Sequence, residues 1–569
     1  MTTQKFQAKQ TKNTKNTLGL SRWLKSLTLG IIPAILTALP VNAAKEISIG
    51  HQGLNISIPV SALETYVKDG EINYELASYM LLLESPNEEE YRQMLQARYN
   101  FPPHIVSQFL NSYMGEILLK NLGQVILSKS KEDSNASIQN GSEDIKTAFL
   151  KAANDSEGLT AINFIRHFPS DTMWLDTKKI VAVNNQFSAL QTNTKAFIET
   201  VANLTSTEAK KEEKIDFSRL ADIRKKGSYK FSQQQMVLQD KERNRNFAVE
   251  FYLPEISAKD ASIPVVVISH GLGSNGVNFE SLAEHLASYG FAVALPQHPG
   301  SDYEYIQKFL AGKTKDMFEG NEFINRPLDV TFLLNELEQL NKYQFHGQLN
   351  LEKVGIFGHS FGAYTAFALA GAEINFNQLK QDCGPQMEVL NMSLLLQCRA
   401  LELNPQKYSL KDDRIGAIFV LDPVNSSLFG KASLAQIQLP VLWGSGSEDK
   451  ITPIVLEQAN SFTWLTTPDK YLVVTEGANH VNINFNAVNK TAFTSIKDLI
   501  QPDPDVVLGY ANALGLAFFQ SHVADKSEYR PYLQASYAKA ISEKPFNLSL
   551  VRSLTETQLS QTLKQTIKE

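Results

Sequence analysis

Hydrophobic positions in this chain change their spacing twice, and the changes divide it into regions of different expected structure. From residue 44 to about 205, apolar residues recur at helical intervals, for example over 103–110 and 145–152, which predicts an all-helical domain. The charged stretch 206–226 predicts a linker. From residue 227 the pattern becomes that of strands.

Between residues 227 and 522, predicted strands are first paired and then alternate with helices. Runs at 229–239 and 246–253 flank a polar turn and predict a hairpin. Val265–Ser269 is a continuous apolar, β-branched run, typical of a parallel strand that is buried on both faces. The pattern predicts an α/β domain at 227–522 with a doubly wound, mostly parallel sheet, followed by a helical C-terminal extension at 523–569.

The first 43 residues differ in composition from everything that follows. Residues 1–25 carry six basic side chains and no acidic one, and an apolar stretch at 27–40 precedes the small residues Val41 and Ala43. This order is that of a secretory signal peptide at 1–43, so we expect an exported protein, periplasmic or secreted. No apolar run reaches the roughly 18 residues that a membrane span requires, so no stable membrane span is expected.

Composition and net charge indicate a globular protein and argue against a nucleic-acid partner. The chain has 43% hydrophobic and 20% charged residues, which is ordinary for a globular protein and excludes a wholly disordered or coiled-coil chain. Its 54 basic and 60 acidic residues give a formal net charge of -6. Without a basic excess we expect no nucleic-acid partner. The oligomeric state stays open.

The two cysteines, Cys383 and Cys398, lie fifteen positions apart in an irregular segment. In an oxidising compartment they are expected to form a disulfide. Neither has a Cys or His neighbour at metal-ligand spacing, so we expect no metal and no cofactor. Both lie in a predicted insertion at 372–414, whose apolar stretch 387–396 suggests a lid that binds acyl chains.

The clearest chemical signal is the G-x-S-x-G motif at residues 358–362, which reads GHSFG. An apolar strand precedes it and an Ala-rich helix follows it. Such a tight turn admits only small residues at its two glycine positions and raises the Ser360 hydroxyl above the sheet. Ser360 is therefore the predicted nucleophile.

A serine nucleophile needs a general base, which follows it in the sequence of α/β-hydrolases. His480 and His522 are the only histidines after Ser360. His480 follows the predicted strand 471–475, on a loop at the edge where the site must lie. His522 follows a long helical stretch and is expected at the surface. His480 is therefore the predicted base.

The acidic partner of that base stays open between two aspartates. Asp449 follows the predicted strand 441–445, and Asp422 ends the predicted strand 415–421. In α/β-hydrolases the acid most often comes from the later position, which favours Asp449, and in a minority from the earlier one, which selects Asp422. Either carboxylate would accept from the imidazole Nδ1–H and stabilise the cation that forms.

Two backbone N–H groups are needed to stabilise the negative charge that develops on the substrate oxygen. Phe361, directly after Ser360, is one predicted donor. Leu272, in the glycine-rich loop after the strand 265–269, is the other, because the neighbouring glycines let the backbone approach a substrate closely.

These residues carry a family resemblance. The stretch 266–302, VVISHGLGSNGVNFESLAEHLASYGFAVALPQHPGSD, together with GHSFG, resembles the platelet-activating-factor acetylhydrolase and dienelactone-hydrolase-like branch of the α/β-hydrolases. The resemblance covers roughly 227–522 and implies a serine carboxylic-ester hydrolase. It implies an acid at Asp422 in the acetylhydrolase pattern and at Asp449 in the bacterial relatives.

The resemblance has two further parts. Dienelactone hydrolases use a cysteine nucleophile, whereas position 360 is Ser. Residues 44–205 look similar to a helical domain of unassigned function that precedes such hydrolases in bacteria. That second likeness implies no chemistry.

Together these features predict an exported serine esterase with an apolar acyl pocket, acting on a small-molecule or lipid ester through an acyl-enzyme. The alternative is a binding or scaffold protein whose helical domain holds a partner and whose hydrolase domain is vestigial. The Ser, His and strand-end Asp set favours the enzyme.

Overall fold

The computed structural model describes residues 44–565, apart from 52–53, 83–91, 94, 100, 129–138, 257–261, 385–386, 388–389 and 481–503. The predicted signal peptide at 1–43 lies outside the described residues. Among the described residues, no helix combines the length and the apolar character that crossing a bilayer demands.

The centre of the molecule is a nine-stranded sheet with the strand order β14-β13-β12-β11-β10-β8-β9-β7-β6. The six strands from β9 to β13 in this order run parallel, and the pairs at both ends are antiparallel. The strands are β6 Phe231–Asp240, β7 Arg245–Pro254, β8 Ile263–Ser269, β9 Ala292–Pro296, β10 Leu349–His359, β11 Ile415–Leu421, β12 Val441–Gly446, β13 Lys470–Thr475 and β14 Leu548–Val551.

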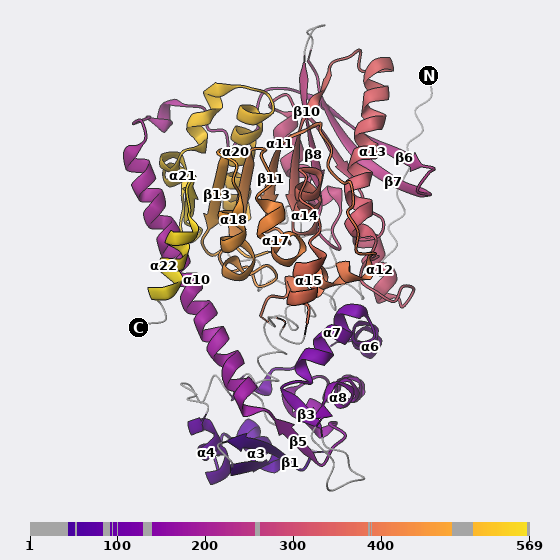
Figure 1. The fold of residues 1–569 in the computed structure, drawn as a ribbon, viewed down its shortest axis with the longest axis vertical. Helices are drawn as coiled ribbons and strands as arrows, with labels where there is room; N and C mark the ends of the chain where they lie inside the picture. Colours follow the sequence, from indigo (N-terminus) through magenta and orange to yellow (C-terminus); the bar gives the residue numbers. More distant parts are fainter. Residues whose placement is uncertain are drawn as a thin grey trace.

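Helices cover both faces of this sheet (Figure 1). One face packs against α11 (Glu280–Ala287) and α20 (Pro504–His522), and the other against α13 (Glu322–Tyr343), α14 (Phe361–Leu369) and α17 (Ser426–Leu434). All five residues of β9 are buried, because a strand with helices on both sides has no face toward water. The predicted parallel sheet with helices on both faces is confirmed.

The region before residue 177 corrects the prediction of an all-helical domain. It contains a second sheet, in the order β2-β1-β5-β3-β4, beside its helices. Its strands are β1 Glu46–His51, β2 Leu54–Pro59, β3 Ile126–Ser128, β4 Gln139–Asn140 and β5 Thr172–Leu175, and its helices are α3 Val60–Asp69, α4 Tyr74–Leu82, α6 Pro103–Leu110, α7 Tyr113–Leu122, α8 Ser142–Asn154 and α9 Ala161–Arg166. The strands are short, and β1 pairs in parallel with β5 from far along the chain, so local helical spacing dominated the pattern.

A single long helix, α10 (Thr177–Lys211), connects this region to the far side of the large sheet (Figure 1). At 1.5 Å per residue its 35 residues span about 52 Å. Its last turns pack against the C-terminal elements, where the Glu212 carboxylate accepts from the backbone N–H groups of Ala535 and Ser536 at 2.8 Å. The helix continues to residue 211, so the predicted linker does not begin at 206.

The C-terminal extension is not helical alone. It forms α21 (Ala535–Ile541) and α22 (Glu556–Gln565), but β14 between them joins the edge of the large sheet beside β13. His522, expected at the surface, is buried, and its Nε2 lies 3.1 Å from the Tyr471 hydroxyl. The prediction for His522 was wrong because α20 packs on the sheet rather than leaving it.

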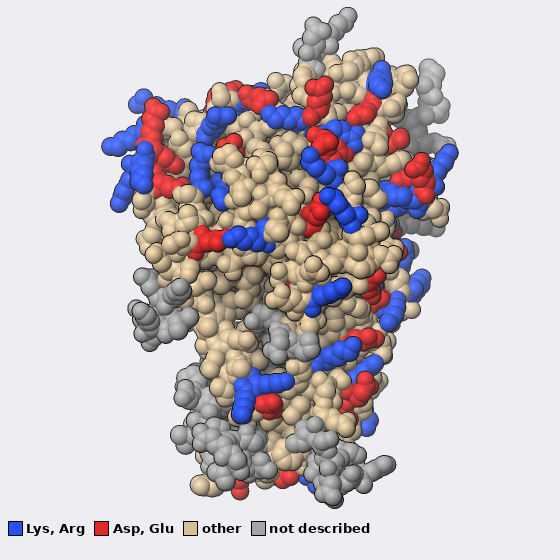
Figure 2. All heavy atoms as spheres, in the orientation of Figure 1, with Lys and Arg blue, Asp and Glu red and all other residues tan. Residues whose placement is uncertain are grey.

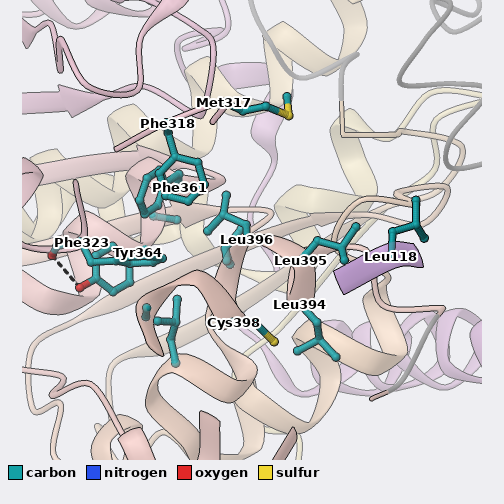
Figure 3. Packing of buried hydrophobic residues seen from close by; sticks show 14 of the residues in the cluster. Leu118, Met317, Phe318, Phe323, Phe361, Tyr364, Leu394, Leu395, Leu396 and Cys398 are labelled. Atoms are coloured by element: carbon teal, nitrogen blue, oxygen red, sulfur yellow. Dashed lines mark hydrogen bonds between the residues drawn. The ribbon is translucent and has the colours of Figure 1, made fainter. Parts of the chain in front are cut away.

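The insertion at 372–414 lies between the large sheet and the N-terminal region. It forms α15 (Phe376–Asp382), α16 (Ser393–Gln397) and a 3-10 turn at Cys398–Glu402, and the expected Cys383–Cys398 disulfide is present. Figure 3 shows the apolar side chains of α16 with Leu118 of α7 on one side and Phe361 of α14 on the other.

Polar contacts also tie the N-terminal region to its neighbours. The Tyr113 hydroxyl donates to the carbonyl oxygen of Cys398 at 3.1 Å, and its backbone N–H donates to Asp316 at 2.7 Å. Over the face drawn in Figure 2, basic and acidic side chains are interspersed rather than gathered by sign.

Candidate active site

Ser360 lies in a strained turn between β10 and α14. Its backbone has φ 56° and ψ -116°, a conformation that residues other than glycine rarely adopt. A Cβ at Gly358 would lie 2.3 Å from the carbonyl oxygen of Gly362, and one at Gly362 would lie 2.0 Å from that of Ser269. Both glycines are therefore required by the closeness of the turn, as the motif predicted.

The loop after β8 packs directly against this turn. A Cβ built at Gly271 would lie 3.3 Å from the Cβ of Ser360. Within the part of the chain that the structure describes, the backbone N–H groups of Leu272 and Phe361 donate to no acceptor. Two N–H groups without partners beside a serine are what an oxyanion hole requires.

A buried arginine holds this loop in place. Arg326 on α13 has no solvent exposure and donates to the carbonyl oxygen of His270 and to the Ser301 hydroxyl at 2.7 Å. Its guanidinium also lies 4.7 Å from the centre of the Phe361 ring. One side chain thus contacts the elements that carry both unpartnered N–H groups.

Arg326 belongs to a larger ionic network of buried groups. Arg245 pairs with Glu322 at 2.8 Å and with Asp329 at 2.7 Å, and Asp329 also pairs with Arg243 and accepts from His298 Nδ1 at 2.9 Å. Ser301 joins the two parts, because its hydroxyl donates to Glu322 at 2.7 Å. We call this set of charged residues the Arg326 network: Arg243, Arg245, Arg326, Asp240, Glu322 and Asp329.

His480 and Asp449 form a hydrogen-bonded pair at the ends of β12 and β13. His480 Nδ1 lies 2.8 Å from Asp449 Oδ2. Asp449 also accepts from Ile451 N, Thr452 N and Thr452 Oγ1 at 2.6–2.9 Å. Burial opposes ionisation of Asp449, but the His480 charge and these donors outweigh it and lower the pKa of the carboxyl.

The same pair changes the basicity of the imidazole. Burial alone would lower the pKa of His480, but the Asp449 charge and hydrogen bond outweigh it and raise that pKa above its ordinary value. The bond to Asp449 also leaves Nε2 as the ring nitrogen that is open to a proton from a nucleophile.

Asp422, the other aspartate that the sequence left open, is placed differently. It is fully buried at the end of β11, with φ 46°, and its Oδ1 accepts from the backbone N–H of Gly446 at 3.0 Å. Burial, followed by the charge of Asp449, raises the pKa of Asp422 well above its ordinary value. The structure gives the hydrogen bond to His480 to Asp449 and not to Asp422.

His359 is a neighbour of the site that the sequence analysis did not single out, although it is the second residue of the motif. Its ring lies 4.8 Å from the His480 ring, and neither of its nitrogens has a partner among the described residues. Burial, and then the charge of His480, lower the pKa of His359 to about 3, so the ring is neutral.

His359, Asp422 and His480 each offer a ligand atom, and these atoms lie within 4.8 Å of one another. They are the group of described residues best placed to hold a cation. A cation there would occupy the imidazole that Asp449 orients, so the pair as it stands favours proton transfer over metal binding.

Ser360 and His480 lie at the same edge of the sheet. The backbone N–H of Ser360 donates to Leu421 O at 2.9 Å, at the end of the strand that leads to Asp422, and its neighbour His359 contacts the His480 ring. Both residues are described, and no hydrogen bond joins their side chains directly. Such bonds are often long without substrate and tighten when it binds.

The fold and this geometry define the class of the protein. Residues 264–378, which include Leu272, Ser360 and Phe361, match a family model described as alpha/beta hydrolase fold. With the nine-stranded sheet, this match shows the α/β-hydrolase fold, and it supports a hydrolase of some kind.

A second family model covers a different part of the chain. Residues 43–176, which lie before the large sheet, match a family described as alpha/beta hydrolase of unknown function (DUF1400). No curated protein matches the chain.

Proposed function

We propose that the protein is an exported serine hydrolase that cleaves carboxylic esters through an acyl-enzyme. The observation that carries the proposal is the strained Ser360 turn, which lies beside two unpartnered N–H groups and at the sheet edge where His480 pairs with Asp449. These are the parts that nucleophilic acyl transfer requires.

In the proposed reaction, Ser360 Oγ forms a bond to the ester carbonyl carbon while its proton passes to His480 Nε2. The carbonyl oxygen takes up the negative charge and accepts hydrogen bonds from the N–H groups of Leu272 and Phe361. His480 then protonates the leaving alcohol as the ester C–O bond breaks. In the second half, His480 takes a proton from water as the water oxygen bonds to the acyl carbon. His480 then returns that proton to Ser360 Oγ while the bond between Oγ and the acyl carbon breaks and the acid leaves.

The proposed substrate is a small-molecule or lipid ester with an apolar acyl group. The support comes from the aromatic surroundings of the Ser360 turn, where Phe318 and Phe323 pack on the Phe361 ring with centroids 5.4 and 5.1 Å apart. The insertion reaches the same cluster, because the Arg399 guanidinium lies 4.7 Å from the Phe318 ring. We infer that the insertion forms an apolar wall of the acyl pocket.

Export is supported by the predicted signal peptide at 1–43 and by the Cys383–Cys398 disulfide, since disulfides persist mainly in oxidising compartments. Borders near 43 and 226 are proposals for expression of separate parts, whereas a cut at 205 would fall inside α10.

A fluorophosphonate probe and a panel of esters graded by acyl length test the proposal. Wild type is expected to be labelled and to hydrolyse the panel, and Ser360→Ala should lose labelling and lower turnover by about 10⁴-fold or more. Ser433→Ala, another buried serine, is the matched control and should keep both. Absence of labelling in folded wild type would instead support the vestigial hydrolase and a binding role.

A further inference from the structure

Two carboxyl groups, those of Asp422 and Asp449, lie beside one basic side chain, His480. Asp422 and Asp449 are both buried, and both lie beside the His480 ring: Asp449 Oδ2 is 2.8 Å from Nδ1, and a carboxylate oxygen of Asp422 lies within 4.8 Å of a ring nitrogen. The Thr452 hydroxyl also contacts both residues, the Asp449 carboxylate at 2.6 Å and the Asp422 carbonyl oxygen at 3.4 Å. Within the described part of the chain, no Lys or Arg forms an ion pair with either of them. Of the described residues that lie beside them, His480 is the one that can carry a positive charge, because burial keeps His359 neutral.

Two carboxylates beside one imidazole, both shielded from water, do not both ionise, because each charge opposes the other and burial opposes both. The proton resides on the carboxyl whose oxygens receive fewer donors. Asp449 accepts four hydrogen bonds, including the one from His480 Nδ1. Asp422 accepts one, from Gly446 N, and its Oδ2 has no protein donor among the described residues. The proton therefore belongs on Asp422.

We propose that Asp422 is a neutral carboxylic acid whose O–H donates to the Asp449 carboxylate, and that it acts as a positioning residue for the His480–Asp449 pair. This inference rests on the proposed function of that pair. The hydrogen bond adds a donor to Asp449 without adding charge, so the two carboxyls together carry one negative charge. If both were ionised, their combined charge would hold a proton on His480 and prevent it from acting as a base.

The backbone supports a dedicated role for Asp422. Its φ of 46° places it in the left-handed region, at a cost of about 1–2 kcal/mol for a residue other than glycine. That conformation turns the side chain at the end of β11 toward Gly446 on β12. Strain of this kind is common at functional sites.

Asp422→Asn is the decisive variant, because its amide keeps a neutral donor for Asp449 and an oxygen for Gly446 N. We expect kcat within a few-fold of wild type and an unchanged acidic limb of the pH profile. Asp422→Ala removes the donor, and should lower kcat by roughly 10- to 100-fold, the loss of one hydrogen bond to a charged group. The limb should also move to higher pH, because Asp449 becomes more basic and holds the proton on His480 more strongly.

Asp449→Asn provides the contrast, with an expected loss of about 10⁴-fold in kcat. A loss of that size in Asp422→Asn would overturn the proposal, since it would mean that Asp422 works as an anion. Wild-type kcat and pH profile in Asp422→Ala would also overturn it, since Asp422 would then have no influence on the pair.

Infrared difference spectroscopy tests the protonation state without using activity. Wild type at neutral pH should show the C=O stretch of a protonated carboxylic acid that disappears in Asp422→Asn. Asp412→Asn is the matched control, because that buried carboxyl pairs with Arg414 at 2.6 Å and is ionised. Its replacement should leave the band in place. A missing band in wild type would contradict the inference about Asp422, whereas missing fluorophosphonate labelling would contradict only the proposed function.

Discussion

Two buried clusters of charged residues lie on either side of the Ser360 turn, and they are balanced differently. The Arg326 network combines three guanidinium groups with three carboxyls, and its ion pairs run at 2.6–3.0 Å. The cluster of Asp422, Asp449 and His480 combines two carboxyls with one titratable base.

This difference in charge balance indicates that the Arg326 network supports the structure of the site, whereas the cluster of Asp422, Asp449 and His480 takes part in proton transfer. In the Arg326 network the three carboxyls form ion pairs with Arg243 and Arg245, and Arg326 donates to neutral oxygens of His270 and Ser301, so the elements around the Leu272 loop are held in one geometry. In the second cluster the charges do not balance, so a proton must be shared, and the pKa values of its members are displaced in opposite directions.

The largest expected effect contrasts one acid from each cluster. Asp449→Ala should lower kcat by about 10⁴-fold, because the pair with His480 is lost, and it should lower the melting temperature less than a substitution in the Arg326 network. Asp329→Asn should instead lose stability, because it leaves two arginines and His298 short of a partner. Ester hydrolysis and thermal unfolding, measured on both variants, check the contrast. Equal melting points for the two variants would contradict it.

The next effect tests whether the Arg326 network positions the predicted oxyanion donors. Arg326→Met should destabilise the fold by about 1–3 kcal/mol, because it leaves the buried His270 carbonyl oxygen and Ser301 hydroxyl without their donor. It should also lower kcat about 10²-fold through displacement of the Leu272 loop. Arg414→Met breaks a pair with Asp412 elsewhere and is the control. If both variants lost activity equally at temperatures where they are folded, the idea that Arg326 positions the Leu272 loop would be contradicted.

A third buried acidic group, Glu457, can be compared with the two clusters, because no Lys, Arg or His of the described residues pairs with it. Its carboxylate accepts from Asn425 N at 2.6 Å, Ser426 N at 2.9 Å and Asn391 Nδ2 at 2.8 Å, and so joins the insertion to the start of α17. In Glu457→Gln, an amide NH2 replaces one of the carboxylate oxygens and faces groups that are themselves donors. The substitution should lower the free energy of unfolding by about 1–3 kcal/mol. Denaturant unfolding measures this, and kcat per folded molecule should stay unchanged.

The smallest effect is the pH dependence of the site. Because the pKa of His480 is raised in the folded protein, kcat/KM should rise with pH through a value above about 6.5, as the imidazole loses its proton. Stability should follow the opposite sign. The pair of protonated His480 with Asp449 contributes its full stability below the pKa of His480 in the unfolded chain. This contribution is lost as the pH rises through the raised pKa of His480 in the folded protein. A midpoint below 6.5 in the kcat/KM profile would contradict the raised pKa.

Local patterns accounted for much of the large sheet. The runs that became β8, β11 and β13 are apolar and short, and helical stretches alternate with them, so periodicity alone placed them. The same method missed β1 and β2, although Ile47, Ile49, Ile56 and Ile58 alternate there, because two six-residue strands were outweighed by the helices that follow. It also missed β14, whose place at the sheet edge depends on residues more than seventy positions earlier in the chain.

The candidate site also combines features that depend on neighbouring residues in the chain with features that depend on distant ones. The strained turn at Ser360 could be predicted from five consecutive residues, because its geometry depends on two small neighbours in the chain. Residue types and their spacing were enough to predict that turn, the strands around it and two equivalent strand-end aspartates. They could not tell that Asp449 bonds His480 while Asp422 is buried beside it, because hydrogen bonding and burial depend on which side chains meet across strands, and the spacing of residues along the chain does not encode those distances.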